Sequence, residues 1–78
     1  MSPNQFYRAL SKDDRAAYAK KLGSSPDYLR IHLFPKSGRP DRSPGLDFLV
    51  KIAEESKGQV SMGEVIDYFA RRHHGRAA

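Results

Sequence analysis

Histidine, cysteine and acidic side chains carry out much of protein catalysis and metal binding, and this chain has few of them at useful spacings. It contains three histidines and no cysteine, so a thiolate metal site, a cysteine nucleophile and a disulfide scaffold are excluded together. His32 can be paired with Asp27 or Ser25 as an acid–base couple, but Asp27 and His32 are five positions apart and point in different directions on a helix. His73 and His74 have no third metal ligand at a useful spacing. We therefore expect neither an enzyme nor a cofactor.

Positive charge is the chemical feature that the chain does have. There are 14 lysines and arginines against 9 aspartates and glutamates, which gives a net charge of +5 over 78 residues. This balance is typical of nucleic-acid-binding domains, although a basic protein without a polyanionic partner has it too. The positions of the cations decide between these interpretations, and those positions depend on the elements that hold them.

The length of the chain allows one small domain. With 38% hydrophobic residues, six glycines and five prolines, the composition is that of a folding chain. No apolar stretch approaches the roughly 20 residues of a membrane helix, and residues 1–5 lack the layout of a signal peptide. We expect a cytoplasmic protein with a single domain over residues 1–74 and a disordered tail over residues 75–78.

Serines organise the chain, because a serine oxygen can accept a hydrogen bond from an otherwise unpaired amide at a helix start. Three serines precede a proline, which is well tolerated at the first helical position; the pairs are Ser2-Pro3, Ser25-Pro26 and Ser43-Pro44. Ser61 and Glu64 have the spacing of a capping box. Ser11, followed by two aspartates, is a looser version of the same signal.

These signals predict five helices, over residues 3–10, 12–22, 26–34, 44–57 and 62–73. Apolar residues at helical spacing support the last two helices. They are Leu46, Leu49, Val50 and Ala53 with Phe48 and Ile52 beside them, and then Val65, Ile66 and Phe69. No segment alternates polar and apolar residues for long enough to predict a strand. The sequence therefore predicts a compact all-α bundle.

Residues 12–34 have the spacing of two helices that cross steeply. The first helix ends at Leu22, and Gly23 supplies a left-handed turn before the second helix begins. Ala19 is small and faces the second helix, while Leu22 and Leu29 are placed to fill the angle between the two. A small residue, a glycine four positions on and an aliphatic residue six further along have the spacing of a helix-turn-helix.

In these residues the chain resembles the Cro/repressor-type helix-turn-helix regulators of phages and bacteria, particularly the compact YdaS-like prophage regulators. The matching positions are Ala19, Gly23, Ser25, Tyr28 and Leu29, then Arg39-Pro40, the helix from Ser43, and Gly58 to Ser61. The resemblance covers roughly residues 10–69. It implies a λ-repressor-like fold and a Cro-like repressor that binds double-stranded DNA in a bacterial cell or phage-infected host. No small-molecule ligand is expected.

The resemblance also implies that the second helix of the motif enters the major groove. With Leu29 and Leu33 packed inward, the residues that face the bases are Pro26, Asp27, Arg30 and Ile31. Arg30 is suited to the O6 and N7 atoms of guanine, and Ile31 to a thymine methyl group. Asp27 either accepts a hydrogen bond from a cytosine amino group or holds Arg30 on the same helix face. Such a pair is also a common feature of solvated helices.

Contacts with the DNA backbone are expected from residues around that helix. They are Arg15, Ser25, Tyr28, Lys36, Ser37, Arg39 and Arg42. Lys36, Arg39 and Arg42 lie in the loop just after the second helix of the motif, where only Asp41 opposes them. Pro35, Pro40 and Pro44 stiffen this loop. Each phosphate neutralised would steepen the salt dependence of binding. The alternative interpretation is a loop that is merely soluble.

Tight binding by so small a domain usually needs two copies on a pseudo-palindromic site, so we expect a homodimer. The candidate interface is the last helix, although its two aromatic residues are equally suited to the core. The interface residues are Val65, Ile66, Tyr68 and Phe69.

The alternative function is a protein-binding module on the same fold, such as an antitoxin or a phage protein that engages host transcription machinery. DNA binding would depend on Arg30 and the loop arginines. Protein binding would depend instead on exposed aromatic residues such as Tyr7, Tyr18, Tyr28 or Tyr68. RNA is less expected as a partner, since no aromatic-rich platform or strand pair is present to stack bases.

Overall fold

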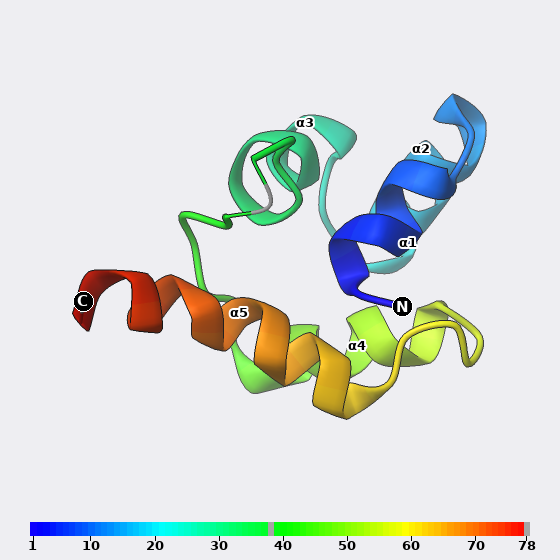
Figure 1. Cartoon of the computed structure of the whole chain (residues 1–78). Helices are drawn as coiled ribbons and strands as arrows, with labels where there is room; N and C mark the ends of the chain where they lie inside the picture. Colours follow the sequence, from blue (N-terminus) through cyan, green and yellow to red (C-terminus); the bar gives the residue numbers. More distant parts are fainter. Residues whose placement is uncertain (38, 78) are drawn as a thin grey trace.

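The five predicted helices are all present in the computed structural model, which describes the backbone of residues 1–37 and 39–77 and the side chains of residues 1–37 and 39–70. In chain order the elements are α1 (Pro3–Ala9), α2 (Lys12–Lys21), α3 (Pro26–Tyr28), the π-helical turn η1 (Leu29–Leu33), α4 (Leu46–Glu55) and α5 (Met62–Ala77). The described residues form no strand, so the predicted all-α class is confirmed. In the view of Figure 1, α1, α2 and α3 form an upper layer, and α4 and α5 lie side by side below it. As far as the helices are described, none has the length and apolar character that a membrane crossing requires.

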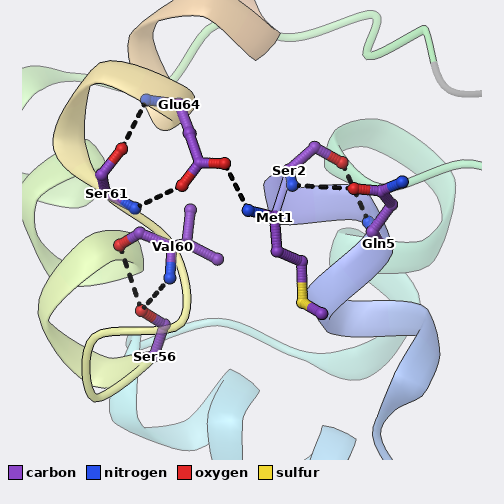
Figure 2. Close-up of polar contacts among 7 residues, drawn as sticks. All are labelled: Met1, Ser2, Gln5, Ser56, Val60, Ser61 and Glu64. Carbon is purple, nitrogen blue, oxygen red and sulfur yellow. Dashed lines mark hydrogen bonds and ion pairs between the residues drawn. The ribbon is translucent and has the colours of Figure 1, made fainter.

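Four serines cap helices as predicted. Each hydroxyl oxygen accepts a hydrogen bond of 3.1–3.2 Å from the amide three residues on; the serines are Ser2, Ser11, Ser25 and Ser61. The Glu64 carboxylate accepts a 2.9 Å hydrogen bond from the Ser61 amide in return, which confirms the predicted capping box (Figure 2). The ammonium group of Met1 contacts the same carboxylate, and this contact together with the Ser61 amide lowers the pKa of Glu64.

The prediction that Ser43 and Pro44 begin the fourth helix is wrong. The N-cap of α4 is Gly45, whose carbonyl accepts a 3.1 Å hydrogen bond from the Leu49 amide, and no side chain caps the helix. Glycine is itself an acceptable N-cap. Starting there also leaves Asp47 in the first turn, where a carboxylate interacts favourably with the helix dipole.

The last helix is longer than predicted. It extends to Ala77, past the predicted end at residue 73. The tail expected over residues 75–78 stays a prediction, because the side chains of residues 71–78, the histidine pair among them, lie outside the described ones.

The core draws on both layers. Its buried residues are Tyr7, Tyr18, Ala19, Leu22, Leu29, Leu33, Phe34, Ile52, Val60, Val65, Tyr68 and Phe69. Two residues of the predicted apolar stripes are exposed. Leu46, at the exposed start of α4, is 69% exposed, and Ile66 is 52% exposed. Ile66 follows the buried Val65 by one position and so lies about 100° around the helix from it, whereas the aromatic residues three and four positions on return to the core.

Two buried tyrosines tie the layers together through their hydroxyl groups. Tyr18 on α2 donates a 2.8 Å hydrogen bond to the Ile52 carbonyl on α4. Tyr68 on α5 donates a 2.6 Å hydrogen bond to the Leu33 carbonyl at the end of η1. Burial raises the pKa of both hydroxyls above the ordinary tyrosine value. The two layers are therefore joined by phenols that are neutral in the folded chain.

The turn between α4 and α5 is built on the buried Ser56. Its hydroxyl group donates a 2.6 Å hydrogen bond to the Ala53 carbonyl. It also accepts a 3.0 Å hydrogen bond from the Val60 amide (Figure 2). Lys57 and Gly58 adopt positive φ values of 55° and 89° in between. One buried hydroxyl group therefore fixes the spacing between the end of α4 and the start of α5.

We expect Ser56→Ala to lower the free energy of unfolding by about 1–3 kcal/mol, because the Val60 amide is then buried without a partner. Thermal unfolding followed by circular dichroism measures the loss. Ser43→Ala is the matched control, since Ser43 is exposed and caps no helix, and its effect should stay within about 0.5 kcal/mol. Equal losses in the two variants would contradict this account of the turn.

Candidate nucleic-acid interface

The turn between α2 and α3 has the predicted conformation. Gly23 adopts a φ of 71°, in the left-handed region. The amides of Gly23 and Ser24 donate hydrogen bonds of 3.0 and 2.9 Å to carbonyls of the last turn of α2, which is the bond pair of a Schellman motif. The three residues predicted to pack where these helices meet, Ala19, Leu22 and Leu29, are all buried.

The helix predicted over residues 26–34 is present, but only its first three residues are α-helical. The π-helical turn η1 continues it and closes with a 2.6 Å hydrogen bond from the Phe34 amide to the Leu29 carbonyl. In an α-helix a residue five positions on lies about 140° around the axis, so Phe34 would face away from the core. The wider turn allows Leu29, Leu33 and Phe34 to be buried together.

The opposite face of α3 and η1 is open to solvent. Pro26, Asp27, Arg30 and Ile31 are all exposed, as predicted for the face turned away from the core. Asp27 Oδ1 lies 3.4 Å from Arg30 Nη2. This exposed face therefore presents an acid, a guanidinium held beside it, and an apolar side chain.

His32 attaches the following loop to η1, a connection that sequence reasoning missed. Its Nδ1 atom lies 3.0 Å from Asp41 Oδ1, and the Asp41 amide donates a 3.0 Å hydrogen bond to the His32 carbonyl. The ring of Tyr28 packs against the imidazole with a centroid distance of 4.9 Å. Asp41 was expected to oppose the loop cations, but its carboxylate is directed to His32 instead.

The remaining predicted contacts to the DNA backbone lie on the surface around this helix. Ser25, Tyr28, Lys36, Ser37, Arg39 and Arg42 are exposed. The hydroxyl oxygens of Ser25 and Ser37 accept hydrogen bonds from nearby amides, and both groups keep a proton to donate. The ion pairs of the described residues include none to the three loop cations.

Arg15 is held more firmly than a surface cation. Its Nε donates a 3.2 Å hydrogen bond to the Tyr7 carbonyl, and its Nη2 donates one of 2.8 Å to the Arg8 carbonyl. The guanidinium also lies 5.4 Å from the centroid of the Tyr7 ring. Arg15 therefore binds the last turn of α1 and keeps part of its guanidinium for another acceptor.

The structure brings several of the predicted residues into one groove of about 430 Å³. Arg15, Arg30, Ile31 and Lys36 line it together with Tyr7, Arg8 and Pro35. Arg8 was missed in the sequence. Its signal was weak, since it is one basic residue in the last turn of α1 and approaches the others only through the fold.

Most of the candidate dimer interface on the last helix is buried within the chain. Val65, Tyr68 and Phe69 belong to the core, and only Ile66 of the four candidate residues is exposed. The prediction that Tyr7, Tyr18 and Tyr68 are exposed aromatic residues is wrong, because all three are buried. Only Tyr28 of the four tyrosines is exposed.

Comparison of the chain with protein-family models, with curated proteins and with solved structures finds no match. Among the residues that the structure describes, no group of three histidine, aspartate or glutamate side chains is close enough to hold a metal ion.

Proposed function

We propose that the chain is a helix-turn-helix regulator of transcription, acting as a Cro-like repressor in the cytoplasm. It binds double-stranded DNA as a homodimer with α3 and η1 in the major groove. The observation that carries this proposal is the solvent-exposed face of Asp27, Arg30 and Ile31, which borders a groove lined by four cations. Such a face combines base-edge readers with phosphate ligands.

The packing behind this face supports the proposal. A recognition helix must be held rigidly if its outer residues are to reach base edges. Here the inner residues Leu29, Leu33 and Phe34 are fully buried, and the turn before the helix is fixed by Gly23. The loop after it is attached through Asp41.

The surface favours DNA over a protein partner. A protein-binding face is typically enriched in exposed aromatic side chains, and three of the four tyrosines are buried in the core. Arginines and lysines predominate around α3 and η1 instead. We therefore place the protein-binding module second.

The test is selection of bound duplexes from a random double-stranded pool at about physiological salt. We expect enrichment of an inverted repeat whose half-sites are about one helical turn apart. A pool retained only at low salt and without enrichment would overturn sequence-specific regulation, and no retention at any salt would overturn DNA binding.

Arg30→Ala should weaken binding to the selected duplex by about 5- to 150-fold, which corresponds to about 1–3 kcal/mol for a guanine contact. The loss on a shuffled duplex should be smaller. Fluorescence anisotropy with both duplexes measures the difference. Arg42→Ala is the comparison, because a backbone contact should weaken both duplexes by the same factor. If Arg30→Ala also weakens both equally, Arg30 does not read a base.

A further inference from the structure

The charged residues that line the groove beside the proposed recognition helix are all positive. Four of its lining residues are cations, namely Arg8, Arg15, Arg30 and Lys36, and none is acidic. Within the described residues the only carboxylate paired with any of the four is Asp27, which lies 3.4 Å from Arg30. A concentration of positive charge in a concave site attracts anions more strongly than the same charges do when scattered.

Two of these guanidiniums are held in place by the backbone. Arg15 donates to the Tyr7 and Arg8 carbonyls, at 3.2 and 2.8 Å. Arg8 Nη2 donates a 3.4 Å hydrogen bond to the Phe34 carbonyl, directly after η1. Because an arginine has five N–H donors, both side chains keep several donors in a fixed orientation.

Arg8 also has a donor without a partner. Its Nε is buried and makes no hydrogen bond to any described residue. Because this atom is out of reach of solvent, the donors that Arg8 offers to the groove are those of its Nη atoms. An oxyanion with several oxygens can accept from two guanidiniums at once, and phosphate matches the arginine fork in geometry.

We propose that this groove is a binding site for one phosphate group, supplied by the backbone of the DNA duplex that α3 and η1 read. The proposal rests on the DNA-binding function proposed above. Arg30 and Ile31 belong both to the exposed reading face and to the groove. A phosphate in the groove therefore lies next to the bases that these residues contact, and it fixes the register of the helix on the duplex.

The first test removes two of the charges, in the full chain, with the double variant Arg8→Gln/Lys36→Gln. The slope of log affinity against log salt should become shallower by about 0.9, the value for one phosphate on duplex DNA. Between 50 and 200 mM salt this reduces the loss of affinity about threefold. The selected and the shuffled duplex should change alike, because a phosphate carries no base identity.

The matched control is Lys51→Gln/Lys57→Gln. It removes the same charge from exposed residues that do not line the groove, and its slope should stay close to that of the unmodified chain. Lys36→Gln alone separates binding from folding, because Lys36 is exposed and belongs to no ion pair of the described residues. The circular dichroism melting curve of each variant is recorded alongside.

The second test uses inorganic phosphate and the free protein. Saturable shifts of the Arg8 and Arg15 Nε–H signals in NMR spectra of the unmodified chain, with the Arg15 shift lost in Arg8→Gln/Lys36→Gln, would support the site. If duplex binding is retained and the double variant keeps the full salt slope, the site is refuted while the proposed function stands. If no duplex binds, the proposed function and the DNA source of the phosphate are both overturned, and phosphate-dependent shifts would then assign the groove to a free phosphate.

Discussion

Replacing Phe34 by alanine is expected to lower the free energy of unfolding by about 3–5 kcal/mol. Phe34 is fully buried, and its ring lies 5.1 Å from that of Tyr7, 6.0 Å from that of Tyr68 and 6.4 Å from that of Phe69, measured between centroids. It therefore joins α1 to α5 through the centre of the molecule. A chain of this length is stable by only about 4–12 kcal/mol, so the variant loses a large part of its stability.

Urea unfolding followed by circular dichroism measures this loss. Phe48→Ala is the matched control, because Phe48 has the same side chain but is only partly buried at the edge of the core. Its loss should be about 1–2 kcal/mol, in proportion to the smaller apolar area removed. A Phe34→Ala loss no larger than that of Phe48→Ala would show that Phe34 is not central to the core.

The helix starts could be predicted from the sequence, whereas the π-helical turn that buries Phe34 could not. Helix starts are local, because a serine oxygen and an amide three residues on decide them, and Ser2, Ser11, Ser25 and Ser61 were therefore predictable. Ser43 has the same local pattern, but the N-cap of α4 is Gly45, two positions on. The π-helical turn η1 was not predictable, because the burial of Phe34 depends on rings from α1 and α5, far away in the chain.

The candidate interface divides in the same way. The outward face of Pro26, Asp27, Arg30 and Ile31 follows from helical spacing once Leu29 is placed inside, and the structure confirms its exposure. Arg8 and Asp41 could not be found by spacing. Arg8 is held beside the groove by its hydrogen bond to the Phe34 carbonyl, and the Asp41 carboxylate contacts the His32 ring. Both contacts connect segments that no periodicity relates.

Alkaline pH is expected to destabilise the fold steeply, and the buried tyrosines determine the sign. Burial raises the pKa of Tyr18 and Tyr68 in the folded chain, whereas the unfolded chain ionises tyrosine near its ordinary pKa of about 10. Above about pH 10 the unfolded chain therefore binds fewer protons than the folded one, and the free energy of unfolding falls as pH rises. Below that pH both states are protonated at these groups, and their contribution is constant.

Each tyrosine should contribute about 1.4 kcal/mol of lost stability per pH unit above this point, or about 2.7 kcal/mol for the pair. Urea unfolding at pH 8, 10 and 11, with tyrosinate absorbance recorded in parallel, gives the slope. Tyr68→Phe should be less stable at pH 8, because the Leu33 carbonyl loses its partner, yet its stability should fall less steeply above pH 10 than that of the unmodified chain. This variant separates the two effects of the hydroxyl group on stability. Its hydrogen bond stabilises the fold at every pH at which the phenol is protonated, whereas its raised pKa changes the stability only above about pH 10. A free energy of unfolding that is unchanged between pH 8 and pH 11 would mean that these phenols ionise as readily in the folded chain as in the unfolded one, and the hydroxyl bonds between the layers would then not hold as described.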